Sequence, residues 1–216
     1  MVVRVGRDHL PAVFEGYLEL EEVLRGLREA LHGGEAGAVR AGQGLEGVRV
    51  SPGSLRPYLH FRRGRYTRNL VYRDASFEVV INCWDSGIAS PIHDHSEQEC
   101  WFSIQAGTFL LPDYPLLLGS RQPGYALLRA PPITRSVGPG HVDYRGPRDS
   151  IHRVAALEGP AVTFHVYASP VTQCLVFDVR RNRCAWRRLG YYSIFGRRVE
   201  APTWGEVDGG VGRAAV

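Results

Sequence analysis

Three histidines carry the clearest chemistry in this sequence. His93 and His95 stand two residues apart in an extended-looking run that follows Gly87 and Pro91, and His152 enters a second such run further on. Because side chains two apart on a strand lie on one face, His93 and His95 are predicted to aim both imidazoles at one point. Imidazole suits iron, zinc, copper and nickel, and three such ligands with open positions are typical of a catalytic metal site. Taken without His152, a pair of this kind is more often two surface histidines in a polar loop, and His152 is what favours a metal site.

The elements that must position these histidines are predicted to be short strands. Glycine and proline are abundant, at 25 and 14 of the 216 residues, which favours many short strands with tight turns over a helical bundle. Turn signals such as Asp85-Ser-Gly87 and Glu158-Gly-Pro160 separate the apolar-rich segments. Their spacing is typical of a sandwich or small barrel. The expected strands are residues 77–84, 93–95, 101–111, 125–129, 141–145, 151–157, 161–167, 173–179 and 185–195.

An amphipathic helix is predicted ahead of these strands. Over residues 17–31 apolar side chains recur at intervals of three and four, and Gly33-Gly34 follows. This stripe should pack on a sheet, and the weakly periodic residues 34–48 allow a second short helix. We expect a single domain over residues 1–200, with a helical part at about 11–57, a β-barrel at about 58–196 and a flexible Gly-rich tail over 200–216.

Composition and charge exclude several classes of protein. Hydrophobic residues make up 44% and charged residues 22% of the chain, as in an ordinary globular protein. The formal charge of +4 comes from arginines scattered among apolar residues without a nucleic-acid-binding signature, so no nucleic-acid partner is expected. Four scattered cysteines form no disulfide framework, and no apolar run approaches the length of a membrane span. We therefore expect a reduced, cytoplasmic, monomeric protein without membrane contact.

Two segments resemble the paired motifs of the cupin superfamily. The first runs from Gly87 through the two close histidines to Gly107, with Cys100 where most cupins place a metal-binding glutamate. The second, residues 147–152, ends at His152. The resemblance extends from about residue 58 to about residue 196.

Further residues narrow this resemblance to one family. Besides Cys100, the chain has Tyr66-Thr-Arg68-Asn-Leu-Val upstream of the first motif and Phe-His165-Val-Tyr167 downstream of the second. Together they make the chain similar to cysteine dioxygenase type I, a thiol dioxygenase within the cupin superfamily.

The resemblance implies a mainly β fold, a cupin-type small β-barrel of the jelly-roll kind with N-terminal α-helices packed on it. It also implies that the chain oxidises L-cysteine with O2 to cysteine sulfinate. A guanidinium can bind a substrate carboxylate through two parallel hydrogen bonds. The implied roles are Fe(II) binding by His93, His95 and His152, substrate binding by Arg68 and Tyr66, catalysis by Tyr167, Cys100 and His165, and a thioether crosslink between Cys100 and Tyr167.

Two residues leave alternatives open. Asn82 stands where the family has an apolar pocket residue, so the preference between cysteine and other thiols is not fixed. Glu99 could restore the usual cupin glutamate ligand, although Cys100 has the better spacing to Gly107. The alternatives are a related thiol dioxygenase for 3-mercaptopropionate or another small thiol, a non-catalytic ligand-binding cupin, and a cupin with Glu99 as a fourth ligand of another metal.

Overall fold

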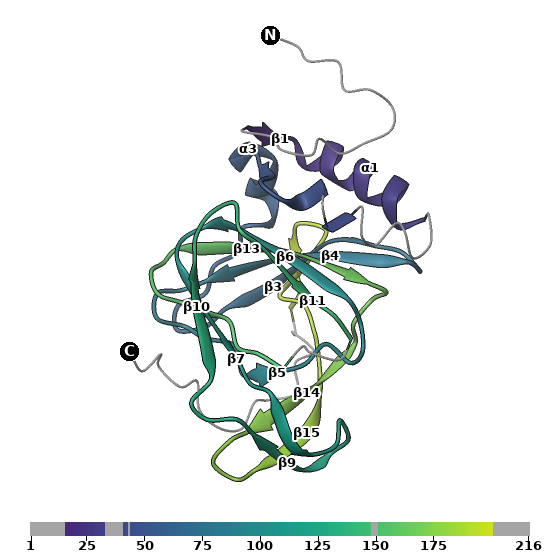
Figure 1. Ribbon diagram of the computed structural model, residues 1–216. Coiled ribbons are helices and arrows are strands. Elements are labelled where there is room, and N and C mark those ends of the chain that lie inside the picture. The colour runs from purple at the N-terminus through teal and green to yellow at the C-terminus, as the bar shows by residue number, and fades with distance from the viewer. Residues whose placement is uncertain (1–15, 33–40, 43, 148–150, 201–216) are drawn as a thin grey trace.

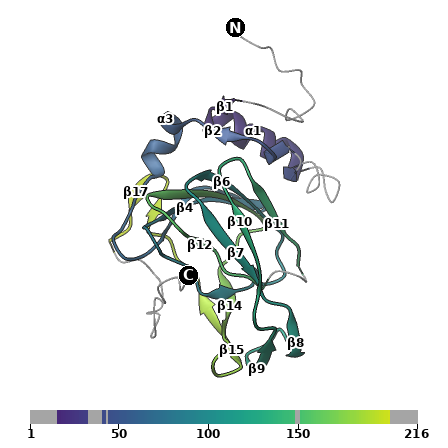
Figure 2. The same ribbon diagram turned by 60° about the vertical axis from the view of Figure 1, so that its left-hand side comes forward.

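The structure is a computed structural model that describes residues 16–32, 41–42, 44–147 and 151–200. A helical layer lies across one end of a body of β-strands (Figure 1). The turned view keeps this layer on the same side, with β14 (Gln173–Asp178) and β15 (Arg183–Arg188) toward the opposite end (Figure 2). The predicted mainly β fold with N-terminal helices packed on it is confirmed. The predicted flexible tail, except for residue 200, lies outside the described residues.

The strands pair into separate sheets, and the described pairings do not close into one continuous barrel. The large sheet has the order β11 (Val142–Arg145), β6 (Cys100–Ala106), β13 (Ala161–Ala168), β4 (Phe77–Trp84), β3 (Thr67–Arg73), β16 (Ser193–Ile194) and β17 (Arg197–Arg198). A second sheet has the order β10 (Ile133–Val137), β7 (Phe109–Asp113) and β12 (Ala155–Ala156). A third has the order β5 (Ile92–His93), β14, β15, β9 (Gly124–Leu128) and β8 (Leu116–Gly119). The helical layer contains β1 (Tyr17–Leu18), α1 (Leu20–Leu31), β2 (Arg49–Val50), α3 (Pro52–Leu55) and the 3₁₀ turn η1 (Arg56–Tyr58).

The N-terminal helix begins later than predicted. Residues 17–18 form β1, which pairs in parallel with β2, although their apolar side chains continue the helical stripe. At the start of α1 the backbone N–H of Glu19 donates to the Glu22 carboxylate at 3.1 Å. This bond satisfies a donor just ahead of the helix and fixes its first turn. In the weakly periodic region, residues 41–42 and 44–45 are helical, while residues 34–40 and 43 lie outside the described residues.

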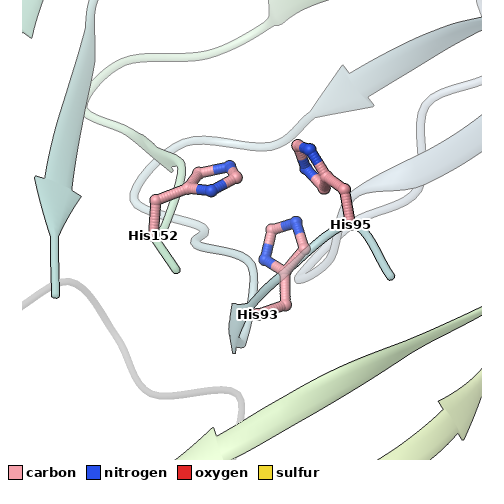
Figure 3. Close-up of side chains that lie close together, drawn as sticks. All are labelled: His93, His95 and His152. Carbon is pink, nitrogen blue, oxygen red and sulfur yellow. The ribbon is translucent and has the colours of Figure 1, made fainter. Parts of the chain in front are cut away.

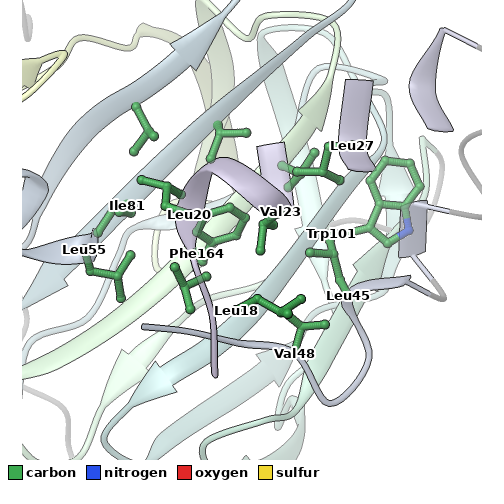
Figure 4. Packing of buried hydrophobic residues seen from close by; sticks show 14 of the residues in the cluster. Leu18, Leu20, Val23, Leu27, Leu45, Val48, Leu55, Ile81, Trp101 and Phe164 are labelled. Carbon is green, nitrogen blue, oxygen red and sulfur yellow. The ribbon is translucent and has the colours of Figure 1, made fainter. Parts of the chain in front are cut away.

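A first hydrophobic core fills the space between the helical layer and the large sheet. Leu20, Val23 and Leu27 of α1 are buried in one cluster with Ile81 of β4 and Phe164 of β13 (Figure 4). Along each strand only alternate residues face this cluster, because successive side chains of a strand point to opposite faces. The helical layer therefore covers one face of the large sheet, and the other face is left for a second core.

The second core joins the large sheet to the β7–β12 sheet. Val80 and Trp84 of β4, on the face away from α1, share a buried cluster with Phe109 of β7 and Ala156 of β12. Tyr167 of β13 belongs to the same cluster. Side chains on this inner face are thus enclosed between sheets, which is where a cupin-type fold would hold a ligand.

Several predicted strands are shorter or divided. The expected strand over 101–111 becomes β6 and β7, because Gly107 turns with a φ of +85°. A Cβ at this glycine would lie 2.5 Å from the Cβ of Ala161, so the turn requires glycine. The segment 151–157 pairs as a strand only at β12, and 185–195 divides between β15 and β16. No helix of the described residues is long and apolar enough to cross a membrane.

Candidate metal centre

The three histidines meet beside the second core, where His95 lies against Tyr167 and His152 against Phe102. Each offers a ring nitrogen, and these nitrogens all lie within 4.8 Å of one another. The ring centroids are 5.4 Å apart for His93 and His95, 4.6 Å for His93 and His152, and 4.9 Å for His95 and His152. The rings turn toward a common point (Figure 3). The predicted convergence is therefore observed.

Backbone pairing positions His93 and His152. The N–H of His93 donates to the carbonyl of His152 at 2.9 Å, and the N–H of His152 donates to the carbonyl of His93 at 3.0 Å. The Nδ1 atom of His93 lies 3.0 Å from the carbonyl oxygen of Pro91. As a hydrogen-bond donor to this carbonyl, Nδ1 carries the ring proton and leaves Nε2 free as a ligand.

His95 is positioned differently from the prediction, because β5 ends at His93. The intervening Asp94 holds this segment against β14: its N–H donates to the Leu175 carbonyl at 3.2 Å. In return the Leu175 N–H donates to its Oδ1 at 3.0 Å. Asp94 is buried between the two histidines. A carboxylate clamp, rather than strand alternation, therefore brings His95 to the centre.

The chemistry of the donor set fits a metal ion. Burial lowers the pKa of His93 and holds the pKa of His95 well below its ordinary value, so both imidazoles are neutral. The Nδ1 of His95 is buried and has no hydrogen-bond partner among the described residues. Three imidazoles that converge, with no fourth ligand side chain beside them among the described residues, match a catalytic metal site more than a structural one.

A buried cation lies beside the histidines. Arg68 of β3 is almost fully buried, and its Nη2 lies 3.5 Å from the carboxylate of Glu78, which is fully buried. The hydroxyl of Tyr191 also donates to Glu78, at 2.5 Å. Nη1 of Arg68 donates to the hydroxyl oxygen of Tyr167 at 3.4 Å, and its Nε is buried without a partner among the described residues. The guanidinium is therefore held in place while retaining an unused donor.

Cys100 and Tyr167 face each other across two neighbouring strands. They are register partners of β6 and β13, so their side chains leave the sheet on the same side. Both side chains belong to the second core, and the ring of Tyr167 lies 5.6 Å from that of His95, centroid to centroid. Burial raises the pKa of the Cys100 thiol and also that of the Tyr167 phenol, so both groups keep their protons.

His165 belongs to a polar chain behind Tyr167. The indole N–H of Trp84 donates to the hydroxyl of Thr163 at 2.9 Å, and this hydroxyl lies 2.7 Å from Nε2 of His165. The Thr163 proton is then directed at Nε2, which places the ring proton of His165 on Nδ1. The imidazole stacks against Tyr167 with centroids 6.0 Å apart and planes 12° apart. Its contact with the phenol is stacking, and the phenol's hydrogen bond comes from Arg68.

Neither of the two residues that left alternatives open is among the described residues that line the pocket beside the histidines. Asn82 contacts His165 instead, with its Nδ2 3.0 Å from Nε2 of that ring. Glu99 accepts a hydrogen bond from the Tyr144 hydroxyl at 2.6 Å on the exposed side. The interpretation of Glu99 as a fourth ligand is not supported by this geometry.

The chain is similar to known proteins in sequence and in structure. A family model described as cysteine dioxygenase type I matches residues 20–180, which include all three histidines, Arg68 and Tyr167. The chain belongs to the cysteine dioxygenase type I family. The cysteine dioxygenase type 1 of Rattus norvegicus is 28% identical over 194 residues, covering 88% of this chain and 94% of that protein. The protein of the same name from Homo sapiens is 26% identical over 197 residues, with the same coverage of 88% and 94%. An RmlC-like cupin protein from Desulfovibrio desulfuricans is similar in structure, with a TM-score of 0.41 and 18% identity, covering 52% of this chain and 91% of that chain.

Membership of the cysteine dioxygenase family confirms the predicted resemblance and the cupin-type fold. The chain is an oxygenase, a thiol dioxygenase whose substrates are a small thiol and O2. The alternative of a non-catalytic ligand-binding cupin is therefore wrong.

Some residues of the site were not foreseen from the sequence. The pocket beside the histidines, called the central pocket below, is lined by Tyr66, Arg68, His93, His95, Tyr167, Cys174 and Arg187 among others. Neither Cys174 nor Glu78, which supports Arg68, had a predicted role in the site. Arg187 lies beyond the residues matched by the family model. Asp149 of the second motif lies outside the described residues.

Proposed function

We propose that the chain is an Fe(II)-dependent cysteine dioxygenase that converts L-cysteine and O2 to cysteine sulfinate, with both oxygen atoms added to sulfur. The observation that carries this proposal is that one pocket is lined by histidines of the converging set and by a buried guanidinium. The first suits a redox metal, and the second suits the carboxylate of an amino-acid thiol.

We propose that His93, His95 and His152 hold the iron. Because burial lowers the pKa of His93 and that of His95, these two imidazoles require no proton release before binding. Three protein ligands would leave coordination positions for substrates. When bound, Fe(II) would supply the redox chemistry that joins the thiol to O2. Asp94 and the paired backbones of His93 and His152 fix the ligand geometry in advance.

Arg68 is proposed to bind the substrate carboxylate. Its Nε has no partner among the described residues, and its two terminal nitrogens make only long contacts, 3.4 and 3.5 Å. The guanidinium is therefore available for shorter, stronger bonds. Tyr66 precedes it on the chain, lines the same pocket and stacks on Trp84 with centroids 4.5 Å apart. Stacking fixes the ring, so the Tyr66 hydroxyl is proposed to share the carboxylate.

Tyr167 is proposed to place its hydroxyl against the bound thiol, with His165 and Arg68 orienting the ring. A thioether between the Cys100 sulfur and the Tyr167 ring, as the family resemblance implies, would hold the phenol in place. That step breaks one S–H and one ring C–H bond and forms one C–S bond. The two electrons and two protons released pass to O2, the co-substrate of the reaction.

Oxygen uptake by the Fe(II)-loaded protein tests the proposed function. L-Cysteine, 3-mercaptopropionate and cysteamine are offered in parallel, and products are identified by NMR. We expect cysteine sulfinate from L-cysteine and the slowest uptake with cysteamine, because it has no carboxylate for Arg68. Faster turnover of 3-mercaptopropionate than of L-cysteine would favour the alternative function, a thiol dioxygenase for 3-mercaptopropionate. An absence of oxygen uptake with iron bound would refute the proposal.

A further inference from the structure

A second arginine reaches the central pocket from another sheet. Arg187 lies on β15, where its register partner on β14 is Cys174, and both residues line the pocket beside His93. Arg68 reaches the same pocket from β3 of the large sheet. The two guanidinium groups therefore approach one ligand volume from different sheets.

Strand register places Arg187 within reach of the histidine centre. Val176 of β14 pairs with His93 of β5, and Cys174, two residues earlier on the same face, pairs with Arg187. Strands about 4.8 Å apart and a rise of about 3.3 Å per residue put the Cα atoms of His93 and Arg187 about 12 Å apart. An arginine side chain covers a large part of that distance.

The Arg187 guanidinium has no acidic partner among the described residues. Its Nη1 is buried without a hydrogen-bond partner there, and no ion pair found among those residues includes it. Arg68, in contrast, is paired with Glu78. Asp94, which also lines the pocket, accepts two backbone N–H bonds with its Oδ1. Arg187 as a whole is half-buried, but its enclosed Nη1 is costly to leave without a hydrogen-bond partner, so this guanidinium favours a negatively charged ligand.

Both guanidinium charges affect the pKa values of two side chains of the pocket, Tyr66 and Cys174. Burial raises the pKa of Tyr66 and that of Cys174, while Arg68 and Arg187 both act to lower these pKa values. Since charge effects of this kind fall with distance, both cations lie near the same part of the pocket.

We propose that Arg187 is a second anion-binding residue of the central pocket, so that the chain binds thiols carrying two carboxylates in preference to thiols carrying one. One carboxylate binds Arg68, the other binds Arg187, and the thiol faces the three histidines. This deepens the proposed function and rests on it, because the thiol and its first carboxylate are taken to lie between the metal site and Arg68. The planar guanidinium fork of Arg187 suits a carboxylate better than a lysine would.

Mercaptosuccinate and 3-mercaptopropionate are the matched probes, because they differ by one carboxylate. Their binding to the Fe(II)-loaded protein is measured by calorimetry without O2, so that turnover is not needed. We expect mercaptosuccinate to bind about tenfold more tightly or better, as one added charged contact allows. Arg187→Gln should abolish this difference. Arg187→Lys, which keeps the charge without the fork, should retain part of it.

Arg188→Gln is the matched control, because Arg188 is the next residue on β15 and is exposed. This variant should keep the full difference. Equal affinities for the two probes in the unmodified protein, or a difference that survives Arg187→Gln, would overturn the inference. The thermal midpoint and the iron content of each variant are also measured. If Arg187→Gln does not fold, Arg187→Lys takes its place in the binding experiment.

Failure of the proposed function is visible separately. Absence of O2 uptake with L-cysteine, combined with Arg187-dependent binding of mercaptosuccinate, would refute the proposed function and support this inference. Oxidation of L-cysteine combined with equal binding of the two probes would support the proposed function and refute this inference.

Discussion

The buried pair of Arg68 and Glu78 allows the proposed substrate-binding role of the arginine to be tested separately from its structural role. Arg68→Gln removes the cation and leaves the Glu78 carboxylate, which has no exposed surface, with the hydroxyl of Tyr191 as its remaining side-chain partner among the described residues. Glu78→Gln in the same chain removes this uncompensated charge and keeps an acceptor for Tyr191. The double variant therefore restores a neutral core without restoring a binding site for a carboxylate.

The two effects have different expected sizes. Breaking a buried ion pair by removing one partner costs about 3–5 kcal/mol of folding stability. Because the two groups here are 3.5 Å apart, we expect Arg68→Gln to cost about 3 kcal/mol, the lower end of this range. The double variant should recover about 2 kcal/mol or more of this loss, because no buried charge is left alone. Loss of the charged contact to substrate, about 1.5–3 kcal/mol, should raise the KM for L-cysteine about tenfold or more in both variants.

Urea unfolding followed by tryptophan fluorescence measures the stability, and oxygen uptake measures the KM. Iron content is determined in each variant to show that the histidine centre is intact. A double variant that regained the affinity for L-cysteine together with its stability would refute the binding role of Arg68. An Arg68→Gln variant as stable as the unmodified protein would refute the argument about Glu78.

Three further predictions concern the metal, the crosslink and the fold. His152→Ala should lower the iron content to about a tenth or less at equimolar iron, since the loss of one ligand costs several kcal/mol of metal affinity. The circular dichroism spectrum should be retained. Full iron binding by this variant would contradict the proposed set of three histidine ligands. Cys100→Ser should remove any crosslinked form, which mass spectrometry detects in the unmodified protein as a mass lower by two hydrogens. If a form lacking two hydrogens persisted in the variant, Cys100 would not be the cysteine of the crosslink. Gly107→Ala should destabilise the fold by about 2 kcal/mol or more, because its φ is +85° and the added Cβ would lie 2.5 Å from Ala161. Gly138→Ala is the control in urea unfolding, because the space around Gly138 is open. Equal losses of stability in the two variants would refute the steric argument.

The fold was predictable where the sequence pattern is local. Strand β4 has the predicted bounds of 77–84, because the whole run is buried and carries a continuous signal. The expected strand over 101–111 failed at Gly107, since its required turn depends on contact with Ala161, a residue distant in sequence. The late start of α1 has a similar cause, because β1 pairs with β2 across the helical layer.

The convergence of the three histidines was predictable from the sequence, whereas part of their surroundings was not. The convergence of the histidines was expected, but its cause at His95 is the contact of Asp94 with β14, which no spacing in the sequence reveals. Arg187 looks like any other arginine of a basic segment. Only the pairing of β14 with β15 shows that Arg187 lines the pocket while Arg188 is exposed.

Oxidation of L-cysteine under an atmosphere of oxygen-18 tests the central claim most directly. The Fe(II)-loaded protein is supplied with labelled O2 in ordinary water, and the product is analysed by mass spectrometry. The proposed dioxygenase reaction predicts cysteine sulfinate in which both sulfinate oxygens carry the label. Product with one labelled oxygen or none, or formation of cystine alone, would contradict the account.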